Sequence, residues 1–134
     1  MNSEEVAEYV SEEYSGKVVE VGVGRRYGVA RSLAERGFDV TVTDVYAREE
    51  FDADTEGVEY AEDDVREPRL SVYEGASLIY SVRLPPELHP YLDDVAREVG
   101  ADLLVVPLGN EGTPLDDVEL VNRGASAFYL GRRE

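Results

Sequence analysis

The strongest constraint on the fold is the stretch from Val18 to Val29, which reads VVEVGVGRRYGV. Apolar residues lead into Gly22-Val23-Gly24, and a helical pattern begins within the next few residues. Glycines are expected there because the chain turns sharply and because a side chain would keep the backbone away from a ligand. A strand, a glycine turn and a helix in this order predict a parallel α/β fold with a ligand at the turn.

The rest of the chain alternates helix and strand patterns. Helices are predicted over residues 3–14, 27–36 and 86–99, with Ser3 as the N-cap of the first. Strands are predicted over residues 17–21, 38–43, 58–60, 76–82 and 102–106, and residues 118–132 read as a hairpin that turns at Arg123-Gly124. This order predicts an α/β, Rossmann-like three-layer sandwich, in which a mostly parallel sheet ends in a C-terminal antiparallel hairpin. At 134 residues, the chain is expected to form one Rossmann-like domain over residues 1–134.

Two ligand classes use such a turn, and the glycine spacing separates them. The dinucleotide fingerprint G-x-G-x-x-G needs a glycine at position 27, which here is Tyr27. Glu20 stands two residues before Gly22, and the pattern Glu-x-Gly-x-Gly resembles the first motif of S-adenosylmethionine-dependent methyltransferases. That resemblance implies a class I methyltransferase-like fold with S-adenosylmethionine bound at Gly22 and Gly24 and with Glu20 near its amino-acid portion.

Two acids that follow the next strands complete the expected cofactor site. Asp44 ends the second strand about 20 residues after Gly24, where an acid accepts hydrogen bonds from both ribose hydroxyls. Asp64 follows the third strand, with Pro68 four residues on, and the resemblance implies that it contacts the adenine amino group. A solvated acidic loop explains Asp64 equally well. For the motif as a whole, the alternative is a tight strand–helix turn that has lost its ligand.

The segments that would carry catalysis show no evident acceptor group. Arg26 replaces the third glycine of the methyltransferase motif, and Arg25 and Arg26 would suit a phosphate or a carboxylate at the turn. Leu84 stands before Pro-Pro, where amine-methylating enzymes carry an acid or amide, so that chemistry is not indicated. Ser81 and Arg83 are polar and close to the strand end, where open α/β sheets place ligands.

Other polar residues give weaker indications. Asn110 and Glu111, after the fifth strand, either line a substrate pocket or belong to a connecting loop. His89 is expected to be a surface or packing residue rather than a base. Tyr27 is the tyrosine that we expect nearest to a ligand.

Composition excludes several classes of function. With no cysteine and one histidine, the chain offers no disulfide, no thiolate nucleophile and no metal site rich in these residues. Asp and Glu total 30 against 13 basic residues, the net charge is −17, and Lys17 is the single lysine. An acidic surface poor in lysine suits a potassium-rich cytosol, so we expect a halophilic archaeal source. The absence of a basic stripe disfavours nucleic acid as a partner.

The remaining expectations concern location and partners. There is no apolar run of the roughly 20 residues that a membrane helix needs, and the acidic N-terminus is unlike a signal peptide. A cytoplasmic protein is therefore expected, with a small adenosine-containing ligand. A protein partner or a second copy of the chain would supply the acceptor surface that a domain this small lacks.

The glycine turn, the segment ASLIYSVRLPPEL over residues 76–88 and the tail VNRGASAFYLGR over residues 121–132 resemble a small archaeal family of uncharacterised proteins of the UPF series. The resemblance covers nearly the whole chain and is most specific from Gly75 to Leu88. It implies the fold and carries over no activity. Two functions stay open: a methyltransferase of unknown acceptor, and a non-catalytic metabolite-binding module or subunit of a larger assembly. A nicotinamide-dependent oxidoreductase is less favoured, because it needs a proton donor such as a Tyr-Lys pair and the only lysine, Lys17, lies before the first strand.

Overall fold

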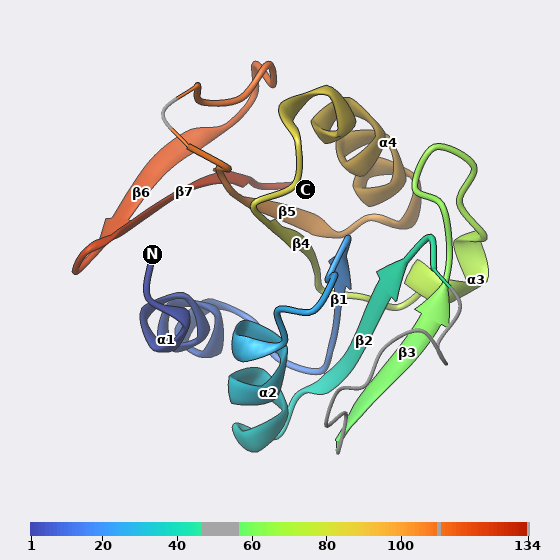
Figure 1. Cartoon of the computed structure of the whole chain (residues 1–134), viewed down its shortest axis with the longest axis horizontal. Coiled ribbons are helices and arrows are strands. Elements are labelled where there is room, and N and C mark those ends of the chain that lie inside the picture. The colour runs from blue at the N-terminus through green and yellow to red at the C-terminus, as the bar shows by residue number, and fades with distance from the viewer. Residues whose placement is uncertain (47–56, 110, 134) are drawn as a thin grey trace.

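The computed structural model describes residues 1–46, 57–109 and 111–133, and in this part of the chain seven strands form one sheet (Figure 1). The strands are β1 (Lys17–Val21), β2 (Asp39–Asp44), β3 (Val58–Glu62), β4 (Leu78–Val82), β5 (Asp102–Val106), β6 (Glu119–Arg123) and β7 (Ser126–Gly131). Their order across the sheet is β3-β2-β1-β4-β5-β7-β6. β1 to β5 pair in parallel, whereas β7 pairs antiparallel with both β5 and β6. The predicted parallel sheet with an antiparallel C-terminal hairpin is confirmed.

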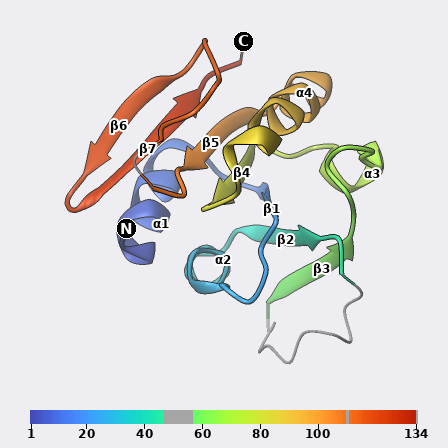
Figure 2. The same cartoon turned by 45° about the horizontal axis from the view of Figure 1, so that its top comes forward.

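Helices cover both faces of the sheet. α1 (Ser3–Glu13) and α2 (Gly28–Glu35) lie on one face, and α3 (Leu70–Tyr73), the 3-10 helix η2 (Pro86–Leu88) and α4 (His89–Val99) lie on the other (Figures 1 and 2). Because successive side chains of a strand point to opposite faces, Val18 packs in the core under α1 and α2, while Val19 packs under α4. The expected three-layer Rossmann-like sandwich is thus confirmed.

The helix ends differ from the sequence prediction in two places. Asn2 rather than Ser3 caps α1, because the Asn2 backbone is extended and its side-chain oxygen accepts hydrogen bonds from the amides of Glu4 and Glu5. The helix predicted over residues 86–99 divides into η2 and α4. It ends as predicted before Gly100, which takes a left-handed conformation at the C-cap.

The order of the strands places a crevice next to β1. The chain leaves β1 towards β2 and β3, and then crosses back to add β4 on the opposite side of β1. The connections that follow β1 and β4 therefore diverge, and open α/β sheets bind ligands in the crevice that such a divergence leaves. The glycine turn follows β1 at this point of the sheet.

The two ends of the chain are joined by polar contacts between α1 and the β6–β7 hairpin, which lie side by side in Figure 2. Arg123 forms ion pairs with Glu8 at 2.7 Å and with Glu12 at 2.6 Å. The amide of Asn2 donates to the hydroxyl of Ser126 at 2.9 Å. The first helix is therefore held in place by the last two strands.

Candidate cofactor site

The turn after β1 contains two glycines in left-handed backbone conformations. Gly22 has a φ of +73° and Gly24 a φ of +59°, values that residues with a β-carbon rarely adopt. A β-carbon on Gly22 would also lie 2.5 Å from Leu84 Cδ1, so the turn packs directly against Leu84. At Gly24, no heavy atom of the described residues, the two chain neighbours aside, lies within 4 Å of the corresponding position. The backbone at Gly24 is therefore open to a ligand.

Asp44, the last residue of β2, faces the same turn. Its Oδ2 accepts a hydrogen bond of 2.7 Å from the amide of Gly24, and its Oδ1 accepts one of 2.7 Å from the amide of Val45. The carbonyl oxygen of Thr43 accepts a further bond of 2.9 Å from the amide of Gly22. The end of β2 thus holds the glycine turn. Asp44 is half-buried, and each of its carboxylate oxygens keeps a lone pair for a ligand hydroxyl.

A pocket of about 310 Å³ lies beside this turn, and we call it the β1–β2 pocket. Gly22, Asp44 and Asp64 all line it, so the structure brings together three of the five residues that the sequence assigned to the cofactor. The rest of its wall consists of Val21, Val45, Tyr46, Asp63, Val65, Arg66, Leu84 and Leu88. Apolar walls with a few polar groups are typical of small-molecule sites.

The two neighbouring acids after β3 have different environments. Asp63 has a buried side chain, which accepts hydrogen bonds from the hydroxyl of Tyr73 at 2.6 Å and from the amide of Arg69 at 3.0 Å. Asp64 is more exposed, and the guanidinium of Arg66 donates to both its oxygens. These hydrogen bonds hold the pKa of Asp64 below its usual value. A ligand amine at Asp64 would share the carboxylate with Arg66, and the adenine contact stays a prediction.

Glu20 lies behind the turn and lines neither this pocket nor the second one described below. Its side chain is buried on the face of the sheet that α1 and α2 cover, opposite Tyr80 of β4. Burial raises the pKa of Glu20 to about 8, and the charge of Asp44 adds to the rise, while the nearby Tyr80 hydroxyl opposes it. Among the described residues, no group forms a hydrogen bond of normal geometry with Glu20 Oε1. Contact with a cofactor would require Glu20 to become accessible, so that role also stays a prediction.

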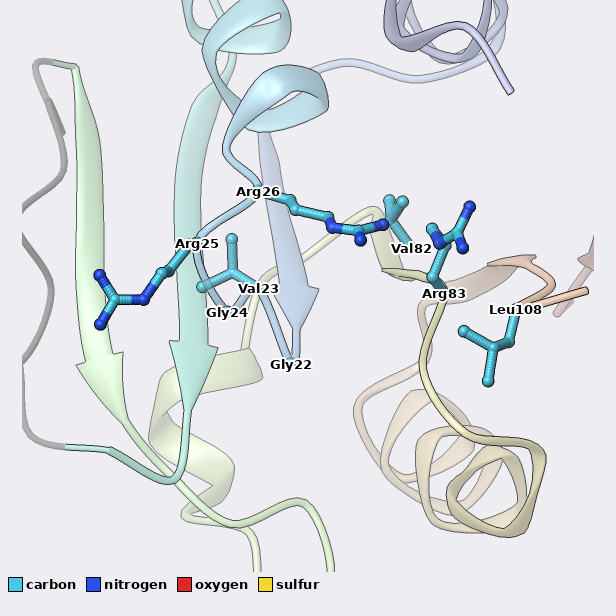
Figure 3. Close-up of a pocket in the computed structure, with 8 residues that line it drawn as sticks. All are labelled: Gly22, Val23, Gly24, Arg25, Arg26, Val82, Arg83 and Leu108. Carbon is cyan, nitrogen blue, oxygen red and sulfur yellow. The ribbon is translucent and has the colours of Figure 1, made fainter.

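A second pocket, of about 210 Å³, lies on the other side of Gly22 between the ends of β1 and β4 (Figure 3). We call it the β1–β4 pocket, and its lining consists of Gly22, Val23, Gly24, Arg25, Arg26, Val82, Arg83 and Leu108. Arg26 points towards Val82 and Arg83, whereas Arg25 points away from them, across β2. Gly22 lines both pockets, so they adjoin at the glycine turn.

The loop after β4 is fixed by hydrogen bonds on either side of Leu84. The amide of Arg83 donates to the carbonyl of Val106 at 2.9 Å. His89 Nε2 lies 3.1 Å from the carbonyl oxygen of Leu84, and its Nδ1 lies 2.8 Å from Thr113 Oγ1. Burial lowers the pKa of His89, which favours a neutral ring that donates from Nε2. His89 is fully buried, so of the two expected roles packing is confirmed and a surface position is wrong.

Several other residues that the sequence singled out lie away from both pockets. Ser81 is fully buried within β4. Tyr27 packs in the core under α1 and α2, so its expected position beside a ligand is wrong. Glu111 is exposed and lines neither pocket. Asn110 lies outside the described residues.

The described ranges contain neither a metal-binding arrangement of side chains nor a helix suited to spanning a membrane. No group of three or more His, Asp or Glu side chains there is arranged to hold a metal ion. None of the helices there is long and apolar enough to cross a membrane.

Solved structures with a similar fold include S-adenosylmethionine-dependent methyltransferases. A TehB-like enzyme of this kind from Corynebacterium glutamicum superposes with a TM-score of 0.64 at 15% identity, covering 100% of this chain and 89% of that one. An RNA methyltransferase from Salinibacter ruber, in complex with S-adenosyl-L-homocysteine, gives a TM-score of 0.57 at 16% identity, covering 96% and 86%. At these identities the similarity shows a methyltransferase-like fold.

Relatives in sequence are archaeal. A UPF0146 protein of Archaeoglobus fulgidus is 48% identical over 130 residues, which are 97% of this chain and 95% of the relative. A UPF0146 protein of Halobacterium salinarum is 43% identical over 116 residues, which are 87% of each. The model of the uncharacterised protein family UPF0146 matches residues 3–133. The chain therefore belongs to the UPF0146 family, which confirms the expected resemblance to a small archaeal family with a methyltransferase-like fold.

Proposed function

We propose that the protein binds S-adenosylmethionine at the glycine turn and is a small methyltransferase of unknown acceptor. The observation that carries this proposal is that Gly22, Asp44 and Asp64 line one pocket at the point where the strand order reverses. The methyltransferases of similar fold support the same ligand class.

The β1–β2 pocket fits the adenosine end of such a cofactor. Asp44 has lone pairs left for two ribose hydroxyls, even with its two backbone hydrogen bonds in place. Val65 and Leu84 offer apolar surface to a base, and Asp64 offers a carboxylate at the rim. The volume of about 310 Å³ falls within the range of about 300–1,000 Å³ that small-molecule sites occupy.

The amino-acid end would extend past Gly22 into the β1–β4 pocket. The open backbone at Gly24 leaves room for this passage, and any side chain there would narrow it. When bound, the cofactor supplies an activated methyl group. The β1–β4 pocket has no carboxylate or imidazole among its described lining residues, so the chain's own contribution would be binding and orientation. The acceptor would then have to arrive as a competent nucleophile.

Calorimetric titration with S-adenosylmethionine, S-adenosylhomocysteine and NAD, in potassium chloride of molar concentration, tests the proposal. Binding of the first two at micromolar concentration, without binding of NAD, is the expected result. If neither adenosyl ligand binds at millimolar concentration, the proposed function is wrong and the glycine turn serves another purpose. NAD binding alone would favour the oxidoreductase. Against that function, the Lys17 ammonium donates to the carbonyl of Glu74, at the opposite end of β1 from the turn.

A non-catalytic binding module is the second candidate, and Leu84 is the observation that favours it. Leu84 occupies the position of the acid or amide of amine-methylating enzymes, and it packs on Gly22 instead of presenting a polar group. Binding of both adenosyl ligands without methyl transfer to any tested acceptor class, with or without copurifying proteins, would support a sensor or a subunit of a larger assembly.

A further inference from the structure

Two arginines that line the β1–β4 pocket have no carboxylate partner among the described residues, although the protein is very acidic. The chain carries 30 acidic residues against 13 basic ones. Among the described residues, carboxylates form ion pairs with Arg36, Arg66, Arg69, Arg97, Arg123, Arg132 and Arg133. In the same ranges, the guanidinium groups of Arg26 and Arg83 form no ion pair or hydrogen bond, and the pocket that they line contains no acid. The charged residues in the described lining of this pocket are therefore all arginines.

The backbone of Arg83 is strained. Its φ is +64°, and it is the one described residue other than glycine with a positive φ. For a residue with a long side chain this conformation is unfavourable, and such strain is concentrated at functional sites. The bond from the Arg83 amide to Val106 and the bond from His89 to Leu84 hold the loop in this shape. Glycine would relieve the strain, yet the position carries a cation.

We propose that Arg26 and Arg83 form a phosphate subsite, which binds the phosphate group of a second small-molecule ligand beside the cofactor. Figure 3 shows both side chains on the same side of the glycine turn. Each guanidinium presents a planar fork of hydrogen-bond donors. Two such groups match the double charge and the several oxygens of a phosphate dianion, whereas one guanidinium is enough for a carboxylate. The inference rests on the proposed function in one respect: if the protein is a methyltransferase, the ligand that carries the phosphate is the methyl acceptor.

The charge elsewhere on the chain points to a small molecule rather than a nucleic acid. A polynucleotide needs cations along several successive phosphates, and a protein with a net charge of −17 repels it outside the pocket. The pocket of about 210 Å³ would also take the amino-acid end of the cofactor, so the side of the pocket at Arg26 and Arg83 suits a single phosphate group. The rest of the molecule that carries the phosphate would lie outside the pocket.

The test is titration of the protein with inorganic phosphate, followed through the Nε–Hε signals of its arginines by nuclear magnetic resonance. We expect saturable shifts of the Arg26 and Arg83 signals, both without ligand and with saturating S-adenosylhomocysteine, and weaker shifts with acetate. Arg26→Ala and Arg83→Gly should each weaken phosphate binding about tenfold. Arg31→Ala, which removes an exposed charge of α2 outside the pocket, should not. Because Arg83→Gly relieves the strained φ, its melting temperature should be equal to or above that of the parent.

Three results would overturn the proposal, and each is distinct from failure of the proposed function. If S-adenosylhomocysteine displaces phosphate and both variants weaken its binding, the arginines hold the cofactor's own carboxylate. If acetate binds as tightly as phosphate, the subsite is not selective for phosphate. If Arg31→Ala weakens binding as much as the pocket variants, the attraction is diffuse. Should no adenosyl ligand bind at all, phosphate binding to the two arginines remains measurable and decides the inference by itself.

Discussion

The carboxylate of Asp44 accepts a hydrogen bond of 2.7 Å from the backbone amide of Gly24, so the acid that ends β2 holds the turn that follows β1. One residue thus ties the glycine turn to the sheet and lines the β1–β2 pocket. A substitution of Asp44 therefore affects both the stability of the turn and the binding of a ligand in this pocket.

Asp44→Ala should lower the affinity for S-adenosylhomocysteine about tenfold or more, because a charged hydrogen-bond acceptor at the ribose is lost. Calorimetric titration measures this change. Asp44→Asn keeps one oxygen for a backbone amide and should lose affinity with a smaller loss of thermal stability. Asp39→Asn, at the exposed start of the same strand, is the matched control and should change neither. Unchanged affinity in Asp44→Ala would move the ribose contact to another residue.

Gly22→Ala should destabilise the fold by about 2 kcal/mol or more, because the new methyl group meets Leu84 and the backbone requires a positive φ. Gly24→Ala also places alanine at a positive φ, but the new methyl group meets no neighbouring side chain. The free energy of unfolding should therefore fall by only about 1 kcal/mol. Urea unfolding of both variants gives the comparison. Combining Gly22→Ala with Leu84→Ala should recover part of the loss, since these two residues are coupled. Equal losses of unfolding free energy in Gly22→Ala and Gly24→Ala would show that the clash with Leu84 does not add to the destabilisation.

Glu20 should make the free energy of unfolding fall as the pH rises from about 4.5 to about 8. The pKa of its carboxyl is 4.5 in the unfolded chain and about 8 when buried, so the folded state binds the proton more tightly. The stability from this group is complete below pH 4.5 and is lost as the pH rises through about 8, by at most about 1.4 kcal/mol per pH unit.

Glu20→Gln removes this titration, and urea unfolding at several pH values measures the difference. Relative to this variant, the parent protein should lose stability as the pH rises from about 4.5 to about 8, and the difference should stay constant above that range. Glu35→Gln, at an exposed position of α2, serves as the control and should leave the pH dependence unchanged. Parallel stability profiles for the parent and Glu20→Gln would contradict the assignment.

The net charge of −17 predicts a salt-dependent stability. Raising potassium chloride from about 0.1 M to about 1 M shortens the Debye length from about 10 Å to about 3 Å and so weakens repulsion among the surface carboxylates. The melting temperature, followed by circular dichroism, should rise over this range. A melting temperature that stays constant or falls would remove the support for an origin in a potassium-rich cytosol.

The parts of the fold that follow from local pattern could be predicted. Gly22 and Gly24 predict the turn, because few other residues adopt its backbone angles. The apolar run from Leu78 to Val82 predicts a central strand, and this strand is buried along its whole length. The four-residue helix α3 was missed, because one turn is too short to show a 3.6-residue period.

The site was harder to predict, because its details depend on contacts between distant residues. Asp63 and Asp64 are adjacent and alike in sequence, but only Asp63 has a buried side chain, which accepts a hydrogen bond from the distant Tyr73 hydroxyl. The positive φ of Arg83 arises from a loop held to β5, for which an arginine gives no local signal. Tyr27 was expected near a ligand because it follows the glycine turn, but its ring fills the core under α1 and α2.

The bonds between α1 and the β6–β7 hairpin also bear on how the chain acquires its structure during synthesis. The helix is synthesised more than 100 residues before its partners Arg123 and Ser126. Until they emerge, the buried side of the helix has only part of its final surroundings, and the ordering of the helix must await contacts more than 100 positions away. Completion of the domain is therefore deferred until β6 and β7 have been synthesised and can pack beside α1.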